Sequence, residues 1–314
     1  MTRKFRTIIF SVLLVLFLIT APSVVLYSYG YRFDFSQKKI VQTGAFYFKT
    51  SPRNAEIYLG GKLIVKTDIL FGSALVENLL PQKYEIEIKK EGFFPWKKNL
   101  EIKEREVTEA KNIILFPQNP KFTILTKNKK EIKDIVSKIS SEENKNEPAV
   151  PQAIKAVLDS ALSYRFAQDQ IIWLDEKRNL YQSDGEGREI KKIAESVKDF
   201  AVSSDSKKIS YFNNYEIWVF FLWPEYGQPK KSAGDRVFLT RFSEEIGKVF
   251  WVSSHYLIFN SGDKIKITGI DDRDRLNIYD LAEFKNQEIF WDQREKFLYV
   301  LSGEGLFVSK TLLP

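Results

Sequence analysis

The stretch FAVSSDSKKISY, residues 200–211, decides the fold of the larger part of this chain. It joins an aromatic strand segment to a second apolar segment through a polar turn, which is the arrangement of two paired β-strands. Three further stretches repeat this order, and they begin at Phe166, Phe250 and Phe290. The spacing between successive leading phenylalanines is 34, 50 and 40 residues, so the chain contains an internal repeat.

The repeat predicts a domain of successive β-sheets. A third strand is expected after the second one, as in Glu216–Val219 and Gly305–Val308. Repeats of about 40 residues made of antiparallel strands are typical of propeller blades, because one sheet cannot bury its face without neighbours. We therefore predict a degenerate β-propeller-like domain over residues 164–314, with an open stack of sheets or an irregular β-sandwich as the alternative. Four units are visible, and strands from 122–125 would add to a fifth.

One repeat carries a recognisable motif. Residues 204–211, Ser-Asp-Ser-Lys-Lys-Ile-Ser-Tyr, resemble the Pro-Asp-Gly-Lys-x-Ile-x-Tyr blade motif of TolB-type and related propellers. The proline and the glycine of that motif are missing here, and no other repeat carries the complete motif. The resemblance implies the same blade architecture and no particular activity.

The amino-terminal segment is apolar enough to cross a membrane. Ile8 to Tyr27 are twenty residues without a charge, and a helix of that length spans about 30 Å of hydrocarbon. Arg3, Lys4 and Arg6 precede it, and short basic flanks favour the cytoplasmic side. Residues 1–31 are therefore predicted as a cytoplasmic flank and a transmembrane signal anchor in the cytoplasmic membrane, with the C-terminal domains on its outer side.

A cleaved signal peptide is the competing interpretation of this segment. Ala21 and Ser23 are small residues after an apolar run, as a cleavage site requires. Against cleavage, the apolar run continues to Leu26, and Pro22 would lie beside the cut. The anchor is our prediction, and cleavage stays open at this point.

Residues 41–117 change to the alternation of half-buried strands. Apolar Tyr84, Ile86 and Ile88 alternate with charged residues, and Gly60-Gly61 is a two-residue hairpin signal. One face of such a sheet is apolar and needs a second layer. The pattern predicts a small antiparallel β-sandwich of about 75 residues.

Four stretches of this region resemble the PEGA domain in their order along the chain. They are Ser51-Pro52-Arg53-Asn54-Ala55, Gly60-Gly61-Lys62, Leu80-Pro81-Gln82-Lys83-Tyr84 and Lys90-Glu91-Gly92-Phe93. Asp68 and Gln82 depart from the Pro and Gly that the family often has there. The stretch from Tyr29 to Asp34 also resembles the juxtamembrane segment of membrane-anchored bacterial PEGA proteins. The resemblance implies an extracytoplasmic β-sandwich of the envelope without catalytic residues.

The segment 118–163 is predicted as a linker with short helices. Its middle part is rich in charge and poor in aromatic residues. Ile132, Val136 and Ile139 recur at helical spacing. A second helix is expected within 152–167, with Pro151 at its start.

The composition excludes several kinds of chemistry. The chain has no cysteine and one histidine, so a disulfide framework, a thiolate nucleophile and a zinc cluster are all excluded. The histidine, His255, could join Ser254 and Asp263 in a hydrolase triad, but there is no Gly-x-Ser-x-Gly elbow. We interpret His255 as an ordinary turn residue. No phosphate-binding glycine loop is present.

A cluster of acidic residues offers carboxylates that could bind Ca²⁺. It comprises Asp271, Asp272, Asp274 and Asp280. Their spacing is not that of a calcium loop, and arginines interleave with them. A solvated charged loop is the favoured interpretation, so neither a metal nor a cofactor is expected.

Exposed aromatic rings are the remaining candidates for ligand contact. Trp96, Trp223 and Tyr226 lie in stretches that read as loops, and exposed rings bind sugars by stacking. The net charge of +7 attracts acidic partners. With the domains outside the cytoplasm, those partners are anionic envelope polymers or an envelope protein rather than nucleic acid, and the lipid bilayer is contacted by residues 8–27.

The predicted fold class is all-β, with an N-terminal transmembrane helix, a small PEGA-like β-sandwich and a degenerate β-propeller-like domain. The function predicted is that of a membrane-anchored extracytoplasmic binding or scaffolding protein, not an enzyme. Two alternatives remain. One is an envelope glycan hydrolase that uses paired carboxylates, and the other is a sensor or assembly factor that binds another protein.

Overall fold

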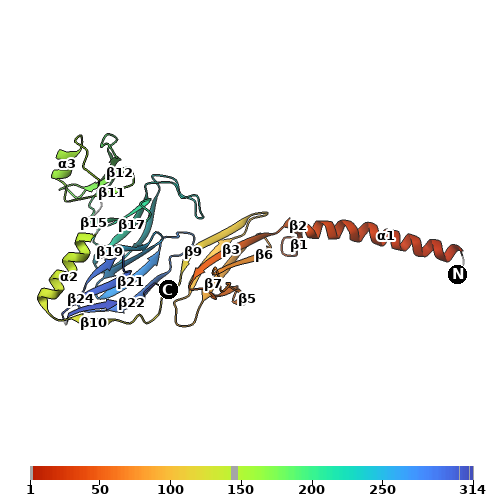
Figure 1. Ribbon diagram of the computed structural model, residues 1–314. Helices are drawn as coiled ribbons and strands as arrows, with labels where there is room; N and C mark the ends of the chain where they lie inside the picture. The colour runs from red at the N-terminus through yellow and green to blue at the C-terminus, as the bar shows by residue number, and fades with distance from the viewer. Residues whose placement is uncertain (1–2, 143–147, 304, 311, 314) are drawn as a thin grey trace. The chain divides into compact units, whose positions relative to one another are not determined.

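The computed structural model describes residues 3–142, 148–303, 305–310 and 312–313 (Figure 1). The predicted anchor, linker and repeat domain each include a few residues outside these ranges. The described chain forms two compact units. The first comprises Met1–Ile88 and Lys97–Ile113, and the second comprises Lys89–Trp96 and Ile114–Pro314.

The first unit begins with one long apolar helix, α1 (Arg3–Ser28). None of its side chains is buried. The hydroxyls of Thr20 and Ser23 donate to the carbonyl oxygens of Leu16 and Ile19, so these polar groups are satisfied within the helix. In length and composition α1 is able to cross a membrane, as either an anchor or a signal sequence does.

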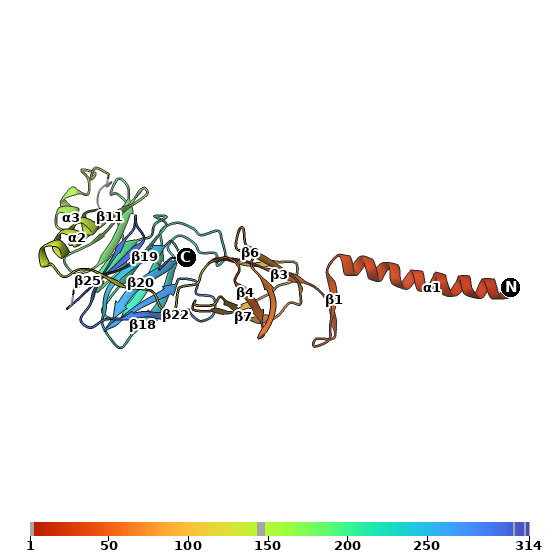
Figure 2. The same cartoon turned by 60° about the horizontal axis from the view of Figure 1, so that its bottom comes forward.

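A two-stranded hairpin follows α1 directly. Its strands are β1 (Tyr31–Asp34) and β2 (Lys39–Gln42), and they form a sheet of their own. The chain leaves the helix at Gly30, which adopts a φ of +81°, a conformation that glycine adopts without steric cost. Figure 2 shows the hairpin turning off at the end of α1.

Two antiparallel sheets form the rest of the first unit, which confirms the predicted sandwich. One has the order β6-β3-β9 and the other β5-β4-β7-β8. Their strands are β3 (Gly44–Ser51), β4 (Glu56–Leu59), β5 (Lys62–Lys66), β6 (Ser73–Leu79), β7 (Lys83–Lys89), β8 (Trp96–Glu101) and β9 (Val107–Ile114).

Alternation along these strands places one face of each sheet in a shared core. Phe46 and Phe48 on β3 are fully buried, as are Ile86 and Ile88 on β7. The ring of Phe46 meets the ring of Tyr84 edge to face, with centroids 5.8 Å apart. These contacts join the two layers, as the alternation of the sequence predicts.

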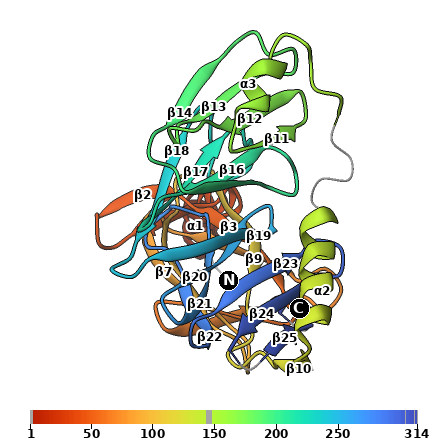
Figure 3. The same ribbon diagram turned by 90° about the vertical axis from the view of Figure 1, so that its left-hand side faces the viewer.

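Four antiparallel sheets of four strands each follow in the second unit, in the manner of propeller blades (Figure 3). Their orders are β11-β12-β13-β14, β15-β16-β17-β18, β19-β20-β21-β22 and β10-β25-β24-β23. The strands of the first two sheets are β11 (Ser163–Ala167), β12 (Gln170–Leu174), β13 (Leu180–Asp184), β14 (Lys191–Ala194), β15 (Asp199–Val202), β16 (Lys208–Phe212), β17 (Glu216–Phe221) and β18 (Arg236–Arg241). Those of the last two are β19 (Ile246–Ser253), β20 (Tyr256–Ser261), β21 (Lys264–Gly269), β22 (Ile278–Glu283), β23 (Glu288–Asp292), β24 (Phe297–Ser302), β25 (Gly305–Ser309) and β10 (Thr123–Thr126).

Successive sheets bury their faces against each other. Ile172 and Leu180 of the first sheet share a cluster with Tyr211 of the second. Val219 of the second sheet packs in a cluster with Trp251 of the third. One further cluster joins the third sheet to the fourth. The predicted propeller-like repeat is thereby confirmed, and its blades stack because each sheet alone leaves an apolar face uncovered.

The segment predicted as a linker contributes to the second unit. β10 is the outer strand of the last sheet, where it pairs antiparallel with β25. The strand expected near 122–125 therefore completes the fourth sheet and does not start a fifth. A sheet built from both ends of a repeat domain ties these ends together.

Two helices lie between β10 and the first sheet. α2 (Lys129–Glu142) confirms the helical spacing of its isoleucines, and the side chain of Asn128 accepts a hydrogen bond from the N–H of Lys130 at its start. α3 is shorter than the helix expected within 152–167, because it spans only Lys155–Asp159. Residues from Ser163 onward form β11 instead, since pairing with β12 outweighs the local helical pattern.

Candidate functional site

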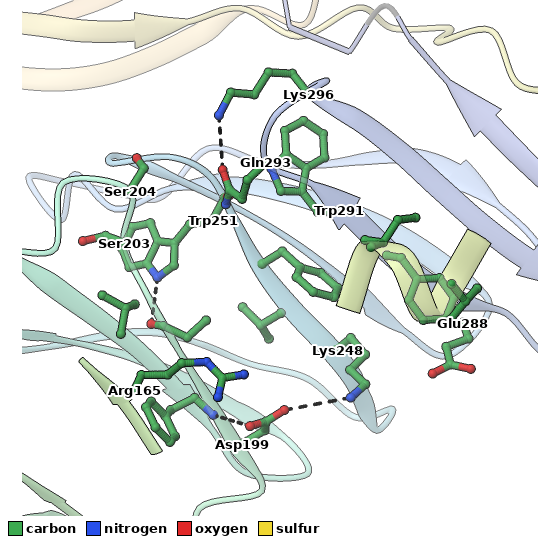
Figure 4. Close-up of a pocket in the computed structure, with 18 of the residues that line it drawn as sticks. Arg165, Asp199, Ser203, Ser204, Lys248, Trp251, Glu288, Trp291, Gln293 and Lys296 are labelled. Carbon is green, nitrogen blue, oxygen red and sulfur yellow. Dashed lines mark hydrogen bonds and ion pairs between the residues drawn. The ribbon is translucent and has the colours of Figure 1, made fainter. Parts of the chain in front are cut away.

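The second unit contains a cavity of about 1070 Å³, which we call the inner-strand cavity. Its wall comprises α2 and the first strand of each of the four repeats, namely β11, β15, β19 and β23, each of which is an edge strand of its sheet (Figure 4). The leading phenylalanine of every repeat stands on one of these strands. All four line the cavity, and they are Phe166, Phe200, Phe250 and Phe290.

The charged side chains of the lining are mainly positive. Among the described lining residues, five are cationic and two are carboxylates. The cations are Lys129, Lys133, Arg165, Lys248 and Lys296, and the carboxylates are Asp199 and Glu288. Like charges around one cavity with apolar walls raise the local concentration of ions of the opposite sign.

Asp199 is held by neighbours from two strands. Its carboxylate accepts a hydrogen bond of 2.9 Å from the N–H of Phe200 and lies 3.9 Å from the Nζ of Lys248 (Figure 4). Asp199 and Glu288 offset part of the positive charge, and the described lining keeps more cationic than anionic side chains.

Three polar contacts organise the β19 and β23 side of the cavity. The Nε1 of Trp251 donates to the carbonyl oxygen of Ala201 at 3.0 Å. The side-chain amide of Gln293 donates to the carbonyl oxygen of Trp251 at 2.6 Å, and Lys296 donates to the Oε1 of Gln293 at 3.2 Å. These bonds fix Gln293 and direct the ammonium group of Lys296 toward it (Figure 4).

Trp291 differs from Trp251 in one respect. Both indoles are 1% exposed and line the cavity. The Nε1 of Trp291, however, has no hydrogen-bond partner among the described residues. A buried donor without a partner lowers the stability of a fold by about 1–3 kcal/mol. A ligand oxygen that accepts a hydrogen bond from this Nε1 would therefore bind favourably.

A second polar cluster lies at the β15–β16 turn. The Nζ of Lys208, a fully buried side chain, lies 2.7 Å from the Oδ2 of Asp205 and 3.5 Å from the Oε2 of Glu225. The hydroxyl of Ser203 donates to Asp205 at 2.6 Å. Burial alone raises the pKa of Asp205, but the hydrogen bonds from Lys208 and Ser203 outweigh it and lower this pKa. The cluster is a closed ion network that stabilises the turn.

His255 stands in the β19–β20 turn near this network. Burial lowers the pKa of His255, and the positive charge of Lys208 acts in the same direction, so the imidazole is neutral near pH 7. The hydroxyl of Ser254 forms a hydrogen bond of 2.9 Å with that of Ser204. Asp263 lies beyond the other end of β20, about 20 Å along the strand at 3.3 Å per residue. The triad of Ser254, His255 and Asp263 is therefore not assembled.

The acidic cluster near residue 271 is divided among cations. Asp271 forms a two-point ion pair with Arg273 at 2.7 Å, and Asp272 lies 2.6 Å from the Nζ of Lys231. Asp280 lies on β22 and pairs with two lysines of β21. These three carboxylates form ion pairs with positive side chains. This arrangement fits the solvated charged loop that the sequence predicts.

The three aromatic candidates from the sequence do not gather at one site. Trp96 is 4% exposed on β8, so its prediction as an exposed loop residue is wrong. It occupies a core position because the alternation of β8 directs its side chain inward. Trp223 packs beside the cluster of the first two sheets and is half-buried. Tyr226 is 82% exposed, and none of the three is among the described lining residues of the cavity.

The cavity itself was not predicted from the sequence, although a signal for it was present. The equivalent phenylalanines of the four repeats occupy equivalent strand positions. In a propeller-like arrangement the first strands of all blades face the same centre. Residues that lead each repeat therefore converge, and the positive residues beside them converge too.

One protein-family model matches part of the chain. Residues 43–114 match the PEGA domain family, so the resemblance seen in the sequence is confirmed for this part of the chain. No curated protein matches the sequence.

Among solved structures, the chain is similar in fold to β-propeller proteins. The β-propeller domain of Cps50 (Swd1) from Myceliophteria thermophila is 13% identical with a TM-score of 0.36, over 73% of this chain and 64% of that chain. A protein of unknown function from Bacteroides thetaiotaomicron is 10% identical with a TM-score of 0.31, over 80% and 63%. The PQQ domain of pyranose dehydrogenase from Coprinopsis cinerea is 12% identical with a TM-score of 0.33, over 46% and 44%. This chain spans less than two thirds of the length of each of the three.

Proposed function

We propose that this chain is a membrane-anchored binding protein of the bacterial cell envelope, whose inner-strand cavity receives a segment of an anionic polymer. The observation that carries the proposal is the lining of that cavity, in which positive side chains surround aromatic rings. Rings provide stacking surfaces for sugar or polyol units, and ammonium and guanidinium groups pair with phosphate or carboxylate groups.

The size of the cavity supports an extended ligand. A volume of about 1070 Å³ is slightly above the range of roughly 300–1,000 Å³ for small-molecule sites. Several monomer units of a polymer fit such a space. Lys129 and Lys133 lie four residues apart on α2, so they stand on one side of the helix and contact successive charges of a chain.

The binding test uses a short poly(glycerol phosphate) as probe and a neutral glucan oligomer as reference. We expect calorimetric titration of the full chain in detergent to give at least about tenfold tighter binding of the anionic oligomer, with affinity falling as salt rises. The double variant Lys133→Glu, Lys296→Glu should lower this affinity by about tenfold or more, because attraction becomes repulsion at two points. Equal affinity for both oligomers would contradict the proposal.

A matched control separates the cavity from general surface charge. Lys191→Glu with Lys192→Glu gives the same change of net charge on β14, outside the described cavity lining. Its affinity for the anionic oligomer should stay within about twofold of that of the original chain, since both lysines are exposed outside the described lining and salt screens exposed charges.

Recovering the oligomer after incubation with the full chain separates binding from hydrolysis. Asp199 and Glu288 are the carboxylates available for glycan cleavage in the described lining, and Asp199 already pairs with Lys248. An anionic oligomer recovered intact after long incubation supports a binding role. Cleaved product that disappears in a Glu288→Gln variant would support the hydrolase instead.

The proposed location depends on α1 staying in the bilayer with its basic flank inside. Protease added to intact spheroplasts should then degrade everything beyond Tyr31, whereas the same protease should leave a cytoplasmic marker protein whole. Full protection of the chain until the membrane is permeabilised would contradict the orientation.

One observation favours the alternative of an assembly factor. Ile69, Leu70 and Phe71 form a loop in which each side chain is more than 70% exposed. Hydrogen bonds from the Ser73 side chain and from the backbone of Phe71 lower the pKa of Asp68, whose carboxylate holds this loop in place. A fixed, exposed apolar loop is a feature of protein-binding surfaces.

A further inference from the structure

We propose that the β1–β2 hairpin is a second membrane-contact element, which lies in the headgroup region of the bilayer beside the end of α1. The inference rests on the proposed membrane anchoring. It adds a surface, defined by Phe33, Phe35 and Ile40, that α1 does not include.

The hairpin exposes its large apolar side chains, whereas a hairpin of a soluble protein usually buries them. Phe33, Phe35 and Ile40 are 47%, 83% and 63% exposed, whereas Asp34 and Val41 are 5% and 2% exposed. Phe33 lies on β1, Phe35 follows it at the start of the turn, and both rings are exposed. Ile40 is the cross-strand partner of Phe33, so it belongs to the same face. The large apolar side chains therefore point outward, and the acidic side chain points inward.

The outward face is ordered rather than loose. The rings of Phe33 and Phe35 meet edge to face with centroids 5.0 Å apart. The carboxylate of Asp34 accepts hydrogen bonds from the N–H groups of Ser36 and Gln37 at 2.8 and 3.2 Å, which fixes the turn. A two-stranded hairpin alone is marginally stable in water, so a surface that covers its apolar face would stabilise it.

The hairpin is joined to the end of α1. Arg32 donates from Nη1 to the carbonyl oxygen of Tyr27 at 2.7 Å, and its guanidinium group stacks over the Tyr27 ring at 3.4 Å. The N–H of Thr43 donates to the carbonyl oxygen of Gly30 at 2.9 Å. These contacts fix the hairpin to the end of the helix that is proposed to meet the bilayer, and Figure 2 shows the hairpin running across the helix end rather than along it.

The composition of the hairpin matches a lipid headgroup region. Aromatic rings are favoured at membrane interfaces, and Tyr29 adds a further ring, 71% exposed, at the base. Lys38 and Lys39 at the turn are exposed and suit phosphate groups. A bilayer surface offers both the apolar acyl boundary and the phosphates within one layer, so we assign it as the occupant.

The absence of cysteine allows single-site probes without background. In the variant Phe35→Cys, labelled with the environment-sensitive dye NBD, the full chain is reconstituted in phosphatidylcholine–phosphatidylglycerol vesicles. We expect blue-shifted emission, strong quenching by a nitroxide on the lipid headgroup and weak quenching by aqueous iodide. Phe35 is exposed, so the substitution leaves the fold intact. Iodide quenching without nitroxide quenching would overturn the inference.

Two further labelled variants serve as controls, one for the anchoring of α1 and one for adsorption of the whole unit. Leu16→Cys lies in the middle of α1 and should be quenched by a nitroxide deep in the acyl chains. If it is quenched while Phe35→Cys is not, anchoring holds and the hairpin inference fails. If neither is quenched, the proposed anchoring fails as well.

The second control is Leu70→Cys. Leu70 is also apolar and is 71% exposed in the same unit, and the label there should remain accessible to iodide. Equal lipid quenching at Leu70 and Phe35 would indicate adsorption of the whole unit and would overturn the inference.

Discussion

Replacing Lys208 with alanine is expected to destabilise the second unit by about 2–3 kcal/mol, one of the largest effects predicted for this protein. The side chain of Lys208 is fully buried and its ammonium group pairs with Asp205 and Glu225. Removing it leaves two carboxylates facing each other without a counter-charge. Their side chains are 26% and 28% exposed, so water screens part of the penalty and the effect falls below that of a wholly buried pair.

Urea denaturation followed by tryptophan fluorescence measures this effect, because five of the six tryptophans lie beyond residue 164. A Lys208→Met variant keeps the volume and should lose nearly as much stability, which assigns the loss to charge rather than to a void. The triple variant Lys208→Met, Asp205→Asn, Glu225→Gln should recover part of it, since the uncompensated charges are gone. A Lys208→Ala variant with unchanged stability would show that the network contributes nothing.

The second large effect is expected in the first unit, at Gly72. This residue has a φ of +68°, and a Cβ built on it would overlap the carbonyl oxygen of Thr50. The N–H of Thr50 donates to the carbonyl oxygen of Gly72 at 2.8 Å, so neither backbone segment is free to move away. Gly72→Ala should therefore destabilise the sandwich by about 2–4 kcal/mol, the combined cost of a left-handed alanine and a backbone clash.

Gly60 provides the matched control for this substitution. It has a φ of +55°, and a Cβ there would have open space around it. Gly60→Ala carries only the conformational cost of about 1 kcal/mol. Hydrogen exchange of the β3 and β6 amides in urea measures both variants within the first unit. Equal losses for the two variants would mean that the contact with Thr50 adds nothing.

Much of the fold could be predicted because the repeating features are local. The alternation of residues 84–88 specifies a strand with one buried face, and the structure places Ile86 and Ile88 in the core. The order of turn motifs identified the PEGA domain at 43–114. The leading phenylalanine of each repeat predicted a sheet, and four sheets are present in the described second unit.

The exposure of single aromatic residues could not be predicted in this way. Trp96 follows Pro95 in a stretch that reads as a loop, yet it begins β8 and is buried. Burial depends on which layer covers a strand, and that is a property of residues distant in sequence. Tyr226, by contrast, is exposed because its loop is closed by backbone hydrogen bonds between Glu225 and Lys231 that leave the tip outside.

The sequence by itself determined the elements of this protein: an apolar helix, a PEGA sandwich and a series of similar β-sheets, since each follows from periodicity over a few residues. Only the tertiary structure decided that β10 completes the last sheet and that the first strands of the four repeats meet around one positively charged cavity. It also decided that Phe33 and Phe35 face outward while Asp34 faces inward. Strand pairing and burial arise between segments far apart in the chain, so no local pattern specifies them.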